Sequence, residues 1–463
     1  MLTYSFENKG SESLYEYLYN QIKSDIISSK LAPDEKLPSK RTLAKHLNVS
    51  TVTVENAYQQ LVAEGYIYSV AKSGYYVSHV PTSQPTSSLK PVWKTKSTSS
   101  PTYFTDFANN STSKDNFPFT TWTKLMRETM SDEADNLMAS SPSIGVAALR
   151  SSIADYLFQF RGMTVNPEQI IIGAGTEYLY GLIIQLLGRK KTYAVEDPGY
   201  QKITKIYQAN EVSCIPIPMD RNGIDIQYLD STNADVLHIS PSHHFPTGIV
   251  TPISRRYELL SWAAKAQDRY IIEDDYDSEF RLLGKPIPSL QSIDVLEKVI
   301  YMNTFSKTLT STIRISYMVL PQSLMEIYKS KLNFYSCTVS TFEQYTLARF
   351  IEKGHFEKHI NRMRNYYRAQ RDAVISCIKK HPLYDKVKIR EENAGLHFLL
   401  TVDTHYSDQE LVERARKNNI HIACLSEYFS NEEHSTEHVL LINYSGIEKE
   451  NIEKAVELLF LSI

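Results

Sequence analysis

The sequence predicts two unlike domains: a small α+β domain near its amino end and a larger α/β domain that ends in a smaller α+β lobe. Residues 10–80 repeat apolar side chains at helical spacing and then show two short strand-like runs. Residues 81–104 are rich in serine, threonine and proline, as in a flexible linker. From residue 105 to 463, strand-like and helix-like runs alternate, which is typical of a mostly parallel sheet with helices on both faces. The smaller lobe is expected from about residue 325 to 463.

Composition and cysteine spacing exclude several classes of protein. The 463 residues carry a net charge of -3, which argues against a polyanion binder that depends on charged tails. The four cysteines lie far apart without a Cys-x-x-Cys pair, so we expect neither a metal site nor a disulfide framework. The sequence shows no signal-peptide pattern and no apolar run of membrane-spanning length. We therefore expect a cytoplasmic protein that does not enter a membrane.

The first 80 residues predict three helices, two of them with serine caps. Apolar residues at three-to-four spacing indicate an amphipathic helix over residues 13–29. Ser39 can cap a second helix that runs to about Leu47, and Ser50 can cap a third that runs to about Glu64. The tight turn between the second and third helices gives a helix-turn-helix layout.

Two short strand-like runs, residues 65–70 and 75–78, follow these helices and predict a hairpin long enough to form a wing. Residues 1–80 contain eight Lys/Arg and eight Asp/Glu, so this domain has no net positive field to attract DNA. A small helical adaptor domain is the alternative. The basic residues nevertheless cluster on the second helix, where a helix-turn-helix contacts phosphates. The residues that we predict to contact DNA are Ser39, Lys40, Arg41, Ser50, Thr51, Thr53 and Lys72.

Two strand-like runs of the larger domain end in reactive side chains. Lys307 follows one run, and Asp274 and Tyr276 follow another. Because ligands of an open α/β sheet bind at the carboxyl ends of its strands, we expect these three side chains to share one site. An amine that can form a Schiff base, an acid for a pyridinium nitrogen and an arginine for a phosphate, Arg314, suit pyridoxal 5'-phosphate (PLP).

Two further segments fit the same cofactor. Residues 170–176 lead into a helical pattern, so backbone amides at the helix start can bind an anion. Tyr200, at the end of Glu196-Asp-Pro-Gly-Tyr, supplies an aromatic face. In this order and spacing, the motifs resemble those of the fold-type I aminotransferases. The resemblance implies that Lys307 forms the Schiff base, that Asp274 pairs with the pyridine nitrogen and that Tyr276 hydrogen-bonds the ring hydroxyl. It also implies that Tyr200 stacks on the ring and that the phosphate is held by Gly175, Thr176, Thr304, Ser306 and Arg314.

The amino-terminal motifs resemble another family. Residues 10–80 contain Leu37-Pro-Ser-Lys-Arg-Thr-Leu-Ala, Ala57-Tyr-Gln-Gln-Leu and Ser73-Gly-Tyr-Tyr-Val, which look like the GntR-type winged helix. Thr51 stands where that family often has arginine, which implies a different base readout. A GntR-type DNA-binding domain, here called the reader, joined by a linker to an aminotransferase-like domain resembles the MocR subfamily of GntR regulators. This resemblance implies a homodimer that binds double-stranded operator DNA with repeated half-sites.

Several positions weigh against transamination. Leu441 stands where similar enzymes carry the arginine that binds the substrate carboxylate, and leucine cannot bind a carboxylate. Phe245 stands in place of an asparagine that holds the ring oxygen, and His243 either substitutes for it or is structural. The subfamily member that responds to γ-aminobutyrate has an arginine in the loop after the stacking tyrosine, where this chain has Gln201 and Lys202.

The preserved cofactor residues favour a sensor over an enzyme. They resemble the PdxR branch of the subfamily, which controls genes for making the cofactor. We therefore predict a DNA-binding transcriptional regulator that binds PLP, responds to PLP as its effector, controls vitamin B6 synthesis and has no enzymatic role. Two alternatives remain: a regulator that senses an amino acid such as γ-aminobutyrate, and an aminotransferase with an accessory DNA-binding domain.

Overall fold

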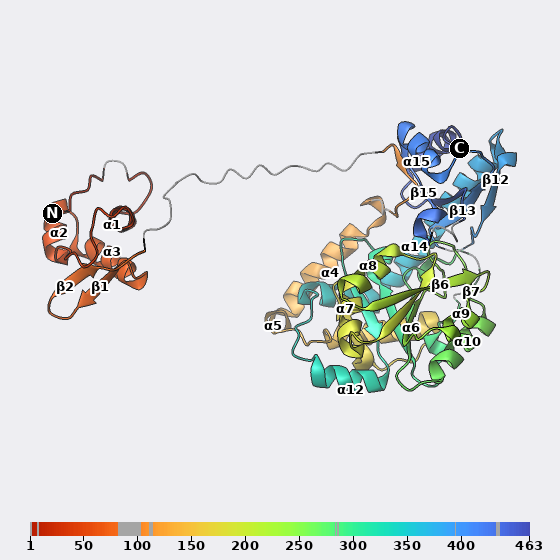
Figure 1. The fold of residues 1–463 in the computed structure, drawn as a ribbon, viewed down its shortest axis with the longest axis horizontal. Coiled ribbons are helices and arrows are strands. Elements are labelled where there is room, and N and C mark those ends of the chain that lie inside the picture. The colour runs from red at the N-terminus through yellow and green to blue at the C-terminus, as the bar shows by residue number, and fades with distance from the viewer. Residues whose placement is uncertain are drawn as a thin grey trace. The chain divides into compact units, whose positions relative to one another are not determined.

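The computed structural model describes residues 2–6, 9–81, 103–110, 114–282, 284, 287–393, 395–431 and 436–463. The chain divides into two compact units, Met1–Ser100 and Pro101–Ile463, which Figure 1 draws. Residues 82–102 of the predicted linker lie outside the described residues. Within the described ranges, no helix is long and apolar enough to cross a membrane.

The first unit consists of three helices and a hairpin: α1 (Leu14–Ile27), α2 (Lys40–Leu47), α3 (Thr51–Ala63), β1 (Ile67–Val70) and β2 (Gly74–Val77). The hydroxyl oxygens of Ser13, Ser39 and Ser50 each accept a hydrogen bond from the backbone N–H three residues later, so each helix begins at a side-chain cap. One apolar cluster draws buried side chains from all three helices and both strands, among them Leu18, Leu43, Leu61, Ile67 and Val77. The predicted winged helix-turn-helix fold is confirmed.

A central sheet of eight strands organises the large lobe of the second unit, in the order β4-β11-β10-β9-β8-β5-β6-β7. The strands are β4 (Ile170–Gly173), β5 (Thr192–Asp197), β6 (Ser213–Asp220), β7 (Gly223–Ile224), β8 (Val236–Ile239), β9 (Tyr270–Asp274), β10 (Val299–Thr304) and β11 (Ser316–Val319). The neighbours β10-β9, β9-β8, β8-β5 and β5-β6 are parallel, whereas β11 and β7 pair antiparallel. The mostly parallel sheet therefore gathers several strand ends at one edge.

Helices cover both faces of this sheet (Figure 1). They are α4 (Phe119–Asp132), α5 (Ala134–Met138), α6 (Ala147–Arg161), α7 (Thr176–Leu187), α8 (Gln201–Ala209), α9 (Ile226–Ser231), α10 (Ile253–Ala264), α11 (Phe305–Thr308), α12 (Gln322–Lys331) and α13 (Thr341–Glu352). Ile170 and Ile172 pack in the cluster that includes α6, whereas Ile171 packs in the cluster that includes α7. Because successive residues of a strand face opposite sides, both faces are buried and the strands are apolar throughout.

The small lobe is built on a four-stranded antiparallel sheet, in the order β12-β13-β16-β15. Its elements are α14 (His355–Lys380), β12 (Val387–Arg390), β13 (His397–Val402), α15 (Asp408–Lys417), β14 (Ile420–His421), β15 (Ala423–Cys424), β16 (Val439–Asn443) and α16 (Ile452–Phe460). A two-residue strand from near the start of this unit, β3 (Thr105–Asp106), pairs in parallel with β14. Phe107, directly after β3, is buried in the cluster of the small lobe.

Candidate cofactor site and candidate DNA-binding surface

A cavity of about 410 Å³ lies where the carboxyl ends of the large-lobe strands meet the small lobe. Among the residues that line it are Thr176, Tyr200, Asp274, Tyr276, Thr304, Ser306, Lys307 and Arg314. These are the residues predicted to bind the cofactor, except Gly175, which immediately precedes Thr176. The structure therefore brings side chains from five separated segments together at one edge of the sheet.

Lys307 lies in α11, the short helix that follows β10. Removal from bulk water lowers the pKa of its ammonium group, although the carboxylates of Asp277 and Asp274 act in the opposite direction. Its Nζ makes no hydrogen bond or ion pair with any side chain that the structure describes. A desolvated, unpaired lysine beside a cavity suits an amine that attacks a carbonyl carbon.

Asp274 ends β9 and presents one carboxylate oxygen without a partner. Its Oδ2 accepts a hydrogen bond from the Tyr180 hydroxyl and lies 3.7 Å from His238 Nε2. Its Oδ1 is buried and has no hydrogen-bond partner within the described part of the chain. An orphaned buried acceptor is costly unless a ligand supplies the donor, and a protonated ring nitrogen is such a donor. The site therefore fits the pyridine ring of PLP.

The predicted phosphate site comprises Gly175, Thr176, Thr304, Ser306 and Arg314, near the amino end of α7. Gly175 has φ 91°, a backbone conformation that favours glycine, and a Cβ atom added there would displace the guanidinium of Arg314. The Ser306 hydroxyl is buried and has no partner among the described residues. The first amides of α7 also lack intrahelical acceptors, as at every helix start. These donors fit an anion of phosphate size.

Thr304 lines the cavity, but its hydroxyl bonds within the protein. Thr304 Oγ1 accepts from the Ser306 backbone N–H at 3.1 Å and from Ser316 Oγ at 2.7 Å. This hydroxyl therefore caps α11, the helix that carries Lys307. Its predicted contact with the phosphate remains a prediction.

The aromatic residues of the site come from separate loops. Tyr200 immediately precedes α8, and its ring lies edge-on to Phe245, with the ring centroids 5.8 Å apart. Tyr276 places its hydroxyl oxygen 3.3 Å from His243 Nδ1, and the same nitrogen lies 2.8 Å from Asp277 Oδ2. His243 is not among the residues that line this cavity, and its ring contacts Tyr276, which does line it.

The residues predicted to contact DNA lie on α2, at the start of α3 and in the hairpin. The hydroxyls of Ser39 and Ser50 cap these helices, and Thr53 Oγ1 lies 2.8 Å from Ser50 Oγ. Lys40 is paired with Glu55 of α3 at 2.5 Å, whereas the side chain of Arg41 is exposed. Thr51 and Lys72 are also exposed, the latter at the turn between β1 and β2.

Comparison with known families accounts for both units. The family model "Aminotransferase class I and II" matches residues 104–459, and the model "Bacterial regulatory proteins, gntR family" matches residues 14–77. The chain belongs to the MocR subfamily of GntR regulators. The predicted fold class and subfamily are thereby confirmed.

Several curated relatives of this MocR regulator match over nearly their whole length. An uncharacterized HTH-type transcriptional regulator of Bacillus subtilis, YdeL, is 38% identical over 96% of this chain and 95% of the relative. The HTH-type pyridoxine biosynthesis transcriptional regulator PdxR of Corynebacterium glutamicum is 30% identical over 90% of this chain and 89% of the relative. The probable rhizopine catabolism regulatory protein MocR of Rhizobium meliloti is 28% identical over 96% of this chain and 92% of the relative.

Solved structures show the fold of the second unit. Kynurenine aminotransferase of Pyrococcus horikoshii superposes with a TM-score of 0.69 at 23% identity, covering 79% of this chain and 91% of the enzyme. LysN, an α-aminoadipate aminotransferase of Thermus thermophilus solved with N-(5'-phosphopyridoxyl)-L-leucine, gives a TM-score of 0.67 at 21% identity, covering 77% and 91%. The MocR regulator therefore carries an aminotransferase fold, whose family binds PLP.

An apolar and aromatic cluster forms part of the cavity wall in this MocR regulator. Leu441 of β16 is buried in a cluster with Leu399, Leu425 and Val439, and this cluster packs against Phe245 and Tyr428. The two last residues line the cavity, with ring centroids 5.2 Å apart. The Lys and Arg residues among the described lining residues are Lys202, Lys307 and Arg314. A guanidinium placed for a substrate carboxylate is therefore absent from the described wall.

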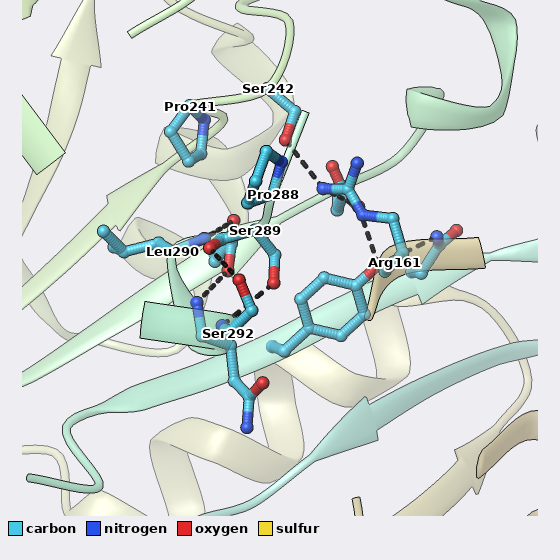
Figure 2. A network of polar contacts seen from close by, with 12 residues as sticks. Arg161, Pro241, Ser242, Pro288, Ser289, Leu290 and Ser292 are labelled. Carbon is cyan, nitrogen blue, oxygen red and sulfur yellow. Dashed lines mark hydrogen bonds and ion pairs between the residues drawn. The ribbon is translucent and has the colours of Figure 1, made fainter. Parts of the chain in front are cut away.

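A buried polar network fixes the strand ends behind the site (Figure 2). Arg161 forms an ion pair with Asp275 Oδ2 at 2.9 Å and donates to Ser242 Oγ at 3.0 Å. Arg256 donates to the backbone carbonyls of Thr251, Pro241 and Pro288. These contacts connect the loop after β8 to the end of β9, and they therefore restrict the movement of the segment that carries Asp274 and Tyr276.

Sequence reasoning missed the residues that support the site from within the fold. Tyr180 lies four residues after Thr176 on α7, one turn along the same helix face, and that spacing was a usable signal. His238 is a lone polar residue in the apolar strand β8, and its Nδ1 lies 2.6 Å from the hydroxyl oxygen of Tyr207. Asn443 and Ser445 line the cavity at the end of β16, where the prediction considered only Leu441.

Proposed function

We propose that this chain is a transcriptional regulator that binds PLP at Lys307 and changes its affinity for operator DNA in response to PLP itself. The observation that carries this proposal is that nearly all of the predicted cofactor-binding residues line one cavity, where Arg314 is the one arginine among the described lining residues and an apolar cluster occupies the position of Leu441. The relative named for regulation of pyridoxine biosynthesis supports vitamin B6 synthesis genes as targets.

The residues that would hold the cofactor are Lys307, Asp274, Tyr276, Tyr200, Gly175, Thr176, Thr304, Ser306 and Arg314. When bound, PLP supplies an electrophilic carbon for the lysine and a ring nitrogen for the acid. The buried Oδ1 of Asp274 would gain a donor, and the Ser306 hydroxyl would gain an acceptor. Cofactor binding thus satisfies polar groups that the protein itself leaves without partners in the described residues.

Contacts between the lobes offer a route from the cavity to the rest of the molecule. The backbone carbonyl of Tyr428, in the small lobe, accepts from Gly199 N–H at 3.0 Å and from Gln201 Nε2 at 2.9 Å. Both donors flank Tyr200, the residue proposed to stack on the cofactor ring. A ligand shifts a conformational equilibrium only if it contacts the two states unequally. A cofactor held by Tyr200 and Lys307 meets this condition if the lobes move relative to each other.

DNA binding is proposed to require a homodimer and two half-sites. Residues 1–80 carry no net charge, and one of their basic residues, Lys40, is already paired with Glu55. A single reader is therefore expected to bind weakly, because phosphate contacts supply most of the non-specific affinity. Two readers joined through a dimer gain effective concentration at a pair of repeats of fixed spacing.

The test is a binding titration on operator DNA selected from a random pool by the full-length protein. Affinity is measured with apo protein, with PLP-loaded protein, and with loaded protein plus a panel of amino acids that includes γ-aminobutyrate. We expect PLP alone to change the affinity and transaminase turnover to be negligible. An effect of the amino acid alone would support the amino-acid sensor, and equal DNA binding with brisk turnover would support the enzyme.

A further inference from the structure

Glu177 places a carboxylate inside the predicted phosphate site. It is the second residue of α7, directly after Thr176, and it lines the cavity. Its Oε1 lies 3.6 Å from Arg314 Nη2 and forms a close ion pair with Lys202 Nζ. One carboxylate therefore already faces both cations on this side of the cavity.

The charges around this position disfavour an anion more than the donor set suggests. Lys202 and Arg314 supply two positive charges, and Glu177 cancels one of them. The hydrogen bond from Lys202 holds the pKa of Glu177 below its ordinary value, so the carboxylate is charged at neutral pH. A phosphate ester brings a charge of about -1.5 to -2 at that pH. Its approach to Arg314 brings it close to a like charge.

We infer that Glu177 competes with the cofactor phosphate for Arg314 and thereby keeps the cofactor exchangeable. This inference rests on the proposed function, since it concerns how tightly the same site holds PLP. An enzyme gains from retaining its cofactor, whereas a sensor responds only while ligand concentration is comparable to its dissociation constant. An acidic residue in the phosphate site lowers the affinity without removing any residue that recognises the cofactor.

The variant Glu177→Gln tests the inference because it removes the charge and keeps the size of the side chain. Apo full-length protein is titrated with PLP, and binding is followed by the absorbance band of the lysine-bound cofactor. The variant should bind PLP about tenfold more tightly, because it removes a negative charge 3.6 Å from Arg314, the arginine predicted to bind the phosphate. Its affinity for pyridoxal, which lacks the phosphate, should not change.

Two further variants test the direction of the change in PLP affinity. Lys202→Gln removes a cation and leaves Glu177 with Arg314 alone, so it should weaken PLP binding while leaving pyridoxal binding unchanged. Glu177→Asp draws the carboxylate back by one methylene and should bind PLP with intermediate affinity. The matched control is Glu128→Gln, in which a carboxylate of α4 that pairs with Lys353 loses its charge. This variant should change the affinity for neither PLP nor pyridoxal.

The outcomes separate this inference from the function on which it rests. Unchanged or weaker PLP binding by Glu177→Gln overturns the inference, and so does an equal gain for pyridoxal. A wild-type protein that shows no absorbance band dependent on Lys307 overturns the proposed function as well. A wild-type band together with tighter, phosphate-dependent binding by the variant supports both.

Discussion

Replacing Asp274 by asparagine removes one buried negative charge and leaves the shape of the side chain almost unchanged. In the wild type, Oδ2 is engaged by Tyr180, while Oδ1 has no partner among the described residues. We propose that Oδ1 receives the protonated ring nitrogen of PLP. The amide of the variant can still bond Tyr180, but it offers no counter-charge to a pyridinium.

The size of the effect follows from the burial of this carboxylate, which is 6% exposed. Removing one partner of a buried charge pair costs about 3 to 5 kcal/mol. Affinity changes tenfold for each 1.4 kcal/mol, so PLP should bind Asp274→Asn roughly a hundredfold to a few thousandfold more weakly. The apo variant should be at least as stable as the wild type, because the buried carboxylate lacks an ion pair with Lys or Arg in the described structure.

Both expectations can be measured on one preparation. PLP affinity comes from equilibrium dialysis together with the absorbance band, and the stability of the apo protein comes from thermal unfolding. A loss of affinity smaller than about tenfold would refute the pairing of Asp274 with the ring nitrogen. A large loss of affinity accompanied by a lower apo unfolding temperature would instead indicate a damaged fold.

Four further predictions concern other residues. Lys307→Ala should abolish the absorbance band near the visible edge, and a retained band in this variant would contradict the assignment of the lysine. Gly175→Ala should weaken PLP binding and lower stability by about 1 kcal/mol or more, measured by dialysis and denaturant unfolding, because its Cβ would lie 2.3 Å from Arg314 Nη2 at a φ of 91°. Burial raises the pKa of Glu196 to about 8. In the wild type this carboxyl group therefore binds its proton more tightly in the folded state than in the unfolded state, and its contribution to the free energy of unfolding falls as the pH rises from about 4.5 to 8. The free energy of unfolding of apo Glu196→Gln should therefore rise relative to that of the wild type across this pH range. A difference between the two proteins that stays constant from pH 5 to pH 9 would contradict the raised pKa. Arg41→Ala should weaken binding to all DNA sequences alike and reduce the salt dependence by about one counterion per subunit, whereas a change at one base position only would assign Arg41 to base readout.

Local signals in the sequence were enough to predict the reader unit. Ser39 and Ser50 were predicted as helix caps, and both hydroxyls accept the expected backbone N–H. The helices begin immediately after these residues because the cap and the first hydrogen bonds lie within four residues of each other. The ends of two strands in the larger domain could also be predicted, because Lys307 and Asp274 follow apolar runs that are buried on both faces.

Features that depend on distant pairing could not be predicted. β12 was not recognised, because its alternating burial arises only where it pairs with β13. The hydroxyl of Thr304 was predicted to contact a phosphate, but a partner twelve residues away, Ser316, determines how it is oriented. Tyr180 and His238 support Asp274 from two other elements, and no short motif includes all three residues.

The pairing of β3 with β14 means that the aminotransferase-like unit has no dispensable amino terminus. The carbonyl of Phe107 accepts from the backbone N–H of Asn443, and Asn110 bonds both Asn443 and Ser445, which line the cavity. A truncation that begins after residue 110 would therefore strip one edge from the small lobe and disturb the wall of the ligand site.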